Sequence, residues 1–135
     1  MDKLNNQIEK ELKNRIKSCH HLGQTNYRLA YLVILTAIIT NIFATFFVAT
    51  DYLLKPYTAL LTAMPGILLL LNRTLKFEDK ARWYWKHMRK LDGLLRAMEF
   101  ESKQAAEISH ELTEIDEMMD AEWPGFGKVP SPLES

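Results

Sequence analysis

The sequence predicts an all-α membrane protein, with an N-terminal amphipathic helix, a two-span transmembrane hairpin and a long C-terminal cytoplasmic helix, assembled as a homo-oligomeric bundle. Three observations predict this class: two long apolar runs lack charges, a short polar connector separates them, and basic residues gather at one end of the pair. We expect four segments: the N-terminal helix at 1–26, the hairpin at 27–72, the long helix at 73–122 and an extended tail at 123–135.

The two spans follow from the lengths of the uncharged runs. The first run holds 22 residues between Arg28 and Asp51, and the second holds 17 residues between Lys55 and Arg73. At about 1.5 Å per residue, the first crosses a hydrocarbon core of about 30 Å. Lys55 can extend its ammonium group to the interface and so lengthen the second span. A soluble hairpin buried in a bundle is the alternative, but buried soluble helices rarely stay uncharged over such lengths.

The charge distribution predicts how the hairpin sits in the membrane. The chain has no net charge, yet residues 1–28 carry +3, residues 73–96 carry +5 and residues 97–122 carry −8. Both basic segments flank the same end of the hairpin, so the positive-inside rule predicts cytoplasmic termini and an external tip. A single cysteine, Cys19, excludes an intrachain disulfide and fits a reducing compartment.

The N-terminal segment carries one narrow apolar stripe at helical spacing. Such a stripe suits pairing with copies of the same helix or with the long C-terminal helix. Gly23 and the polar residues after it predict a break or a kink before the first span. If copies pair, three residues of the stripe meet on the oligomer axis as a dry gate: Leu4, Ile8 and Leu12.

Small and polar residues share one face of the first span. This face is the candidate pore lining, and it comprises Ala37, Thr40, Asn41, Ala44 and Thr45. Small residues in a membrane mostly indicate close helix packing. Asn41 differs, because an amide near mid-membrane needs a partner or water, and it fits an oligomer seam and an aqueous path equally well.

The segment after the hairpin reads as one long helix with a coiled-coil seam from Phe77 to Met98. The seam weakens afterwards, and its spacing at 102–108 predicts local overwinding or a bend. His87 and His110 are expected to be solvated. The tail after Glu122 is expected to fold back by its aromatic residues or to stay loose.

No pattern typical of catalysis is present. The sequence lacks a nucleophile–base set, a phosphate-binding glycine loop and a metal-ligand spacing, so we expect no enzyme, no cofactor and no metal. In an oligomer the basic segments would form a ring that binds either anionic lipid or a phosphate-bearing ligand. The candidate anion-binding residues are Lys13, Lys17, Arg82, Lys86, Arg89 and Lys90.

The order of these features resembles the SLATT family of two-transmembrane effectors. The most distinctive part is the aromatic and basic segment from Lys80 to His87, followed by Leu91, Leu94, Leu95, Arg96 and Phe100, and the resemblance covers residues 5–120. It implies a prokaryotic antiphage effector in the bacterial inner membrane. It also implies a partner nucleotidyltransferase that makes a nucleotide or oligonucleotide signal.

Together, the residues and the resemblance predict a homo-oligomer, with a tetramer favoured, that forms a pore in the lipid bilayer and is gated by such a signal. A membrane-anchored coiled-coil scaffold that docks a soluble partner is the alternative. A small multidrug-type transporter is disfavoured because the spans contain no carboxylate for proton coupling.

Overall fold

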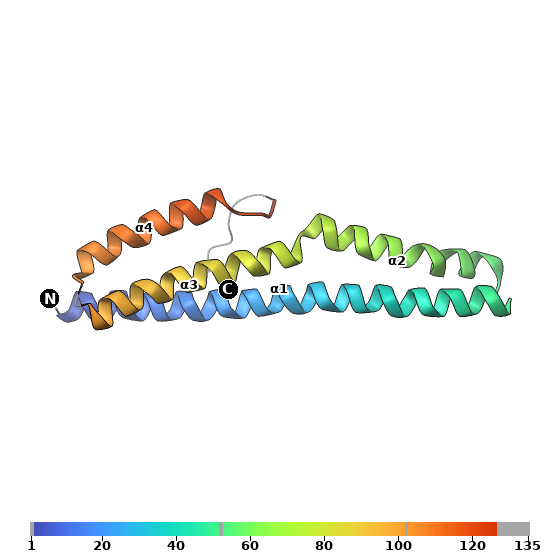
Figure 1. Cartoon of the computed structure of the whole chain (residues 1–135), viewed down its shortest axis with the longest axis horizontal. Helices are drawn as coiled ribbons and strands as arrows, with labels where there is room; N and C mark the ends of the chain where they lie inside the picture. Colours follow the sequence, from blue (N-terminus) through green and yellow to red (C-terminus); the bar gives the residue numbers. More distant parts are fainter. Residues whose placement is uncertain (1, 52, 102, 127–135) are drawn as a thin grey trace. The chain divides into compact units, whose positions relative to one another are not determined.

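The computed structural model describes residues 2–51, 53–101 and 103–126, with the backbone alone for residues 2–4. This part of the chain is all-helical (Figure 1), which confirms the all-α part of the predicted class. Its helices are α1 (Asp2–Thr50), α2 (Lys55–Leu75), α3 (Phe77–Phe100) and α4 (Ala105–Ala121). The helices form two compact units. The hairpin unit spans Asn26–Glu78, and the three-helix unit joins α1 up to Thr25 with the chain from Asp79 onward.

In the hairpin unit, α1 and α2 are long and apolar enough to cross a membrane. Only 11% of the most apolar window of the first and 0% of that of the second are buried inside the chain. Large side chains such as Ile42, Phe46 and Leu70 are more than half exposed. Exposed apolar faces of this size are typical of surfaces that contact lipid or another protein chain.

The two helices of the hairpin meet along seams with alternating three- and four-residue spacing. The α1 seam carries alanines at its most buried positions, and small residues let two membrane helices approach closely. On α1 the seam is Ala30, Val33, Ala37, Thr40, Ala44 and Phe47, and on α2 the least exposed residues are Thr58, Leu61, Pro65, Leu68 and Asn72.

The three-helix unit has its own apolar core, to which α1, α3 and α4 each contribute a face. Its fully buried large side chains are Leu12, Cys19, Leu91, Ile108 and Met119. The face of α3 is wider than the predicted coiled-coil seam, because Trp83, His87 and Leu94 are buried beside it. A helix that packs against two neighbours needs such a wide face.

The predicted break at Gly23 is wrong, because α1 runs through it without interruption. The residue instead allows a close approach. A Cβ atom at this position would lie 2.7 Å from Nε1 of Trp85 and 3.4 Å from Cβ of Tyr84. Glycine therefore makes room for the Trp85 indole against α1, and the predicted helix boundary at residue 26 is internal to one helix.

The single long helix predicted at 73–122 is also wrong, since it is interrupted twice. Lys76 adopts a left-handed conformation (φ 51°, ψ 41°) that ends α2, and a second break lies between Phe100 and Ala105. The second break coincides with the predicted bend at 102–108. The spacing of the apolar residues changes there, so a straight helix could not keep the apolar faces on both sides of the break in one core.

The break lets α4 return to α3, where the start of the tail folds back. Nε1 of Trp83 donates a 2.8 Å hydrogen bond to the Met119 carbonyl, and the Trp123 ring lies edge-on at 4.8 Å between ring centroids. Folding back, one of the two expectations for the tail, is thus found at Trp123. The rest of the predicted tail, residues 127–135, lies outside the described residues.

Candidate functional site

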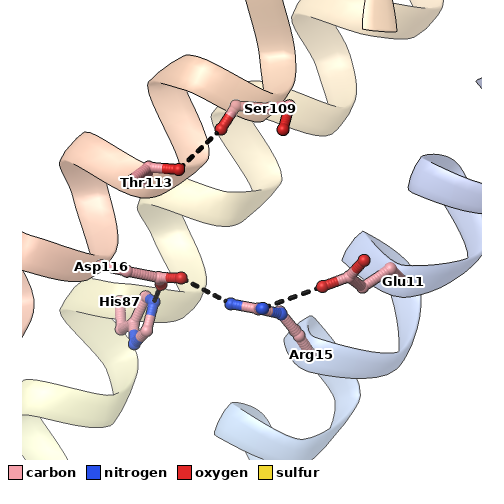
Figure 2. A network of polar contacts seen from close by, with 6 residues as sticks. All are labelled: Glu11, Arg15, His87, Ser109, Thr113 and Asp116. Atoms are coloured by element: carbon pink, nitrogen blue, oxygen red, sulfur yellow. Dashed lines mark hydrogen bonds and ion pairs between the residues drawn. The ribbon is translucent and has the colours of Figure 1, made fainter. Parts of the chain in front are cut away.

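A polar network links all three helices of the three-helix unit (Figure 2). The Arg15 guanidinium on α1 donates a 2.7 Å hydrogen bond to Oδ2 of Asp116 on α4, and its second amino group pairs with Glu11 at 2.8 Å. Nε2 of His87 on α3 lies 3.3 Å from the other carboxylate oxygen of Asp116. One carboxylate from α4 thus faces a cationic group on α1 and an imidazole on α3.

The burial of these groups determines how strongly they interact. His87 is only 7% exposed, which corrects the expectation that it is solvated, whereas His110 is exposed as predicted. Burial on its own would raise the pKa of Asp116, but the attraction of His87 and the hydrogen bond from Arg15 outweigh it, so this pKa lies below 3.8. The carboxylate is therefore ionised at neutral pH and fixes α4 to the other two helices.

Three nitrogen atoms of the network retain unused hydrogen-bonding capacity. Nε of Arg15 and both ring nitrogens of His87 are buried without a hydrogen-bond partner among the described residues, although Nε2 lies 3.3 Å from Asp116. Nearby, burial raises the pKa of the Cys19 thiol to about 11, with a smaller lowering effect from Arg15. Within the part of the chain that the structure describes, no group of three His, Cys, Asp or Glu side chains could hold a metal ion.

The residues proposed to line a pore divide between two faces of α1. Ala37 and Ala44 are buried and Thr40 is half-buried, all on the seam where α1 and α2 run side by side. Asn41 and Thr45 are exposed on the adjacent face. The predicted five-residue lining is therefore not one free surface, since small residues in membranes serve helix contact first.

Asn41 and Thr45 belong to a second stripe on α1, which we call the free stripe. All of its side chains are exposed and follow the same three- and four-residue spacing: Ile34, Ile38, Asn41, Thr45 and Val48. With one Asn among β-branched residues, this stripe has the composition of a helix-pairing seam.

Within the span, the polar side chains differ in how they are satisfied. Thr40 donates to the Thr36 carbonyl at 2.7 Å, and Thr45 donates to the Asn41 carbonyl at 2.9 Å. Such bonds remove the cost of a hydroxyl in hydrocarbon. The Asn41 amide has no side-chain hydrogen-bond partner among the described residues. It requires one from outside this chain segment.

The residues proposed as a gate lie in the core of the three-helix unit. Leu12 is fully buried and Ile8 packs against the same core. Their apolar surface is therefore used within the chain, which was the other pairing expected for this stripe, and is not free to form a plug between copies. The side chain of Leu4 lies outside the described residues.

The candidate anion-binding residues are partly occupied by the chain's own carboxylates. Lys13 pairs with Glu9 and lies 3.5 Å from Glu99, and Lys86 pairs with Glu122. Lys17, Arg82 and Arg89 are exposed, and Lys90 is half-buried. An anionic ligand would therefore compete with acidic residues of α1, of α3 and of the turn after α4.

The Arg15–Asp116–His87 network was not predicted from the sequence. One signal was available: Arg15 follows Leu12 by three residues and precedes Cys19 by four, so a charge interrupts the buried stripe of α1. Its partner lies 101 positions away and could not be inferred from helical spacing.

Comparisons with known proteins give no match for this chain among protein-family models, curated proteins or solved structures. Function is therefore inferred from the residues and their geometry, with the resemblance of residues 5–120 as a hypothesis.

Proposed function

We propose that the protein is a homo-oligomeric membrane effector whose free stripe on α1 faces the oligomer axis and lines a pore. The observation that supports this best is the Asn41 amide, exposed in mid-span without a side-chain partner among the described residues. An amide both donates and accepts, so copies around an axis can satisfy one another or hold water. Thr45, one turn along, would add a second polar ring.

The structure changes two parts of the expected mechanism. The α1–α2 seam removes Ala37, Thr40 and Ala44 from the pore wall, and the core of the three-helix unit removes Ile8 and Leu12 from the gate. Control of the pore is better assigned to the three-helix unit, because α1 belongs to both units as one helix. A tetramer, a bacterial inner membrane, antiphage defence and a nucleotide signal remain predictions that rest on the resemblance and the charge pattern.

Assembly through the free stripe is tested by cysteine cross-linking in membranes, in a Cys19→Ser background. Ile38→Cys, Asn41→Cys and Thr45→Cys should form disulfide-linked dimers under mild oxidation. Ala37→Cys and Ala44→Cys are matched controls on the face of α1 that packs against α2, and they should stay monomeric. Equal cross-linking at both sets, or none at the free stripe, contradicts the proposal.

Conduction is tested with the purified full chain in planar bilayers. Asn41→Leu should lower conductance at least about tenfold, because it replaces a water-holding amide by an apolar group of similar volume. Ile42→Leu, one residue along on a lipid-facing side, should leave conductance unchanged. Cross-linking without any conductance would favour the scaffold alternative, although much of the coiled-coil seam of α3 is buried within the chain.

A further inference from the structure

A hollow of about 250 Å³ lies on α1, at the end of the hairpin that carries the basic residues. It is lined by Tyr27, Arg28, Tyr31 and Leu32. The two tyrosines are 51% and 58% exposed, and Leu32 is 55% exposed. The lining is almost wholly apolar, and one of the four residues that form it, Arg28, carries a positive charge.

The hollow lies where the hydrocarbon region ends. Arg28 is the last charge before the 22-residue uncharged run, and Arg73 is the first charge after the 17-residue run of α2. Because α1 and α2 are antiparallel and joined by a short connection, both arginines mark the same end of the hairpin. When the hairpin spans a bilayer, Leu32 reaches acyl-chain depth and Arg28 reaches phosphate depth, with the tyrosines in the interfacial belt.

The charge at this end of the hairpin favours an anion. Arg28, Arg73 and Lys76 are opposed in the hairpin unit by one acidic residue, Glu78, since its other carboxylate is Asp51 at the tip. A guanidinium group offers a planar pair of donors that matches a phosphate diester, and a lysine would lack this geometry.

We infer that this hollow binds an anionic phospholipid, with the phosphate at Arg28 and the first acyl carbons against Tyr31 and Leu32. A soluble phosphate fits the guanidinium but leaves the apolar floor in contact with water. The lipid covers both parts, and its added headgroup charge suits the excess of basic residues.

The test is native mass spectrometry of the full chain in detergent, titrated with phosphatidylglycerol or with phosphatidylcholine of the same acyl chains. The wild type should retain phosphatidylglycerol in preference to phosphatidylcholine. Arg28→Gln should weaken phosphatidylglycerol binding about tenfold and leave phosphatidylcholine binding unchanged. Tyr31→Ala should weaken the binding of both lipids.

Arg96→Gln is the matched control, because it removes the same charge from an exposed position of α3. It should retain full phosphatidylglycerol binding. Equal binding of the two lipids by the wild type, or an equal loss in both arginine variants, overturns the inference. So does displacement of the lipid by inorganic phosphate at equal concentration, which would identify a soluble anion as the occupant. None of these readouts depends on conduction, so the lipid site and the pore can fail separately.

Discussion

Arg15 and Asp116 lie 101 residues apart in the sequence, and their side chains meet in a 2.7 Å hydrogen bond that joins α1 to α4. The arginine side chain is 19% exposed, so water screens this pair only in part. The attraction within a half-buried pair of this kind is largely offset by the cost of removing both charges from water, so its net contribution to stability is small. An arrangement in which α4 leaves the bundle is nevertheless disfavoured, because one charge would stay buried without its partner. The pair therefore fixes the position of a helix whose apolar spacing alone would tolerate a shift along α3.

Replacing Asp116 by alanine should destabilise the three-helix unit by about 2 kcal/mol, because it leaves Arg15 and His87 without their shared carboxylate. Thermal unfolding followed by circular dichroism in detergent measures the change. Asp120→Ala, an exposed acid on the same helix, should alter stability by no more than about 0.5 kcal/mol. Similar losses of stability in the two variants would mean that Asp116 acts only through the overall charge of α4 and not through its contacts with Arg15 and His87.

The same carboxylate should make stability depend on acid pH. Its pKa is lowered below 3.8 in the folded chain, so the folded state resists protonation more than the unfolded state does. This contribution is complete above the unfolded pKa and is lost as pH falls through the folded pKa. Between about pH 5 and pH 2, Asp116→Asn should lose less stability than the wild type. Parallel melting curves over that range would contradict the role of Asp116.

Two glycines in helices should respond in opposite ways to alanine. At Gly23 a Cβ atom would lie 2.7 Å from Nε1 of Trp85, so Gly23→Ala should cost about 1–3 kcal/mol by overpacking. At Gly93 no atom lies within 4 Å of the added Cβ, so Gly93→Ala should stabilise by up to about 1 kcal/mol through helix propensity. Denaturation of both variants under one condition tests the pair. If Gly23→Ala stabilises the chain, the glycine at this position only lowers helix propensity and is not needed to make room for Trp85.

Much of this fold follows from helical spacing. The stripes through Leu12 and Cys19, and through Ile108 and Met119, are buried as their three- and four-residue steps predict. Predictions from residue spacing were wrong where one residue type can serve two structural roles. Glycine breaks helices and also admits a large neighbour, and alanines in a span suit a pore wall and also a helix seam. Only the identity of the neighbour decides, as Trp85 does at Gly23.

The network at His87 could not be predicted for a related reason. Periodicity shows which face of a helix is buried, but it does not say which side chain of another helix lies opposite. His87 flanks the expected seam and is buried only because α4 turns back after Phe100. The direction of that turn depends on contacts between residues far apart in sequence, of which Trp83 with Met119 is one.

The native cysteine should be nearly inert. Cys19 is 1% exposed, and burial raises its pKa to about 11, so fewer than about one thiol in a thousand is ionised near neutral pH. A maleimide should label the folded chain very slowly and the denatured chain at once, as measured by the mass increase. Gly23→Ala should accelerate labelling if its overpacking loosens the neighbouring turn of α1. Rapid labelling of the folded wild type would mean that this core opens readily.

The orientation of the hairpin should follow its charge asymmetry. Basic residues are concentrated at the end opposite Asp51, whereas the tip carries Lys55 alone, and the positive-inside rule retains the more basic end in the cytoplasm. In intact bacterial cells a membrane-impermeant maleimide should label Asp51→Cys at the tip. It should label Glu114→Cys, an exposed position on α4, only after the membrane is permeabilised. The inert Cys19 can stay in both variants and serves as an internal background. If Glu114→Cys reacts in intact cells and Asp51→Cys does not, the three-helix unit is external. An intracellular signal could then not reach it, and the pore would need a trigger from outside the cell.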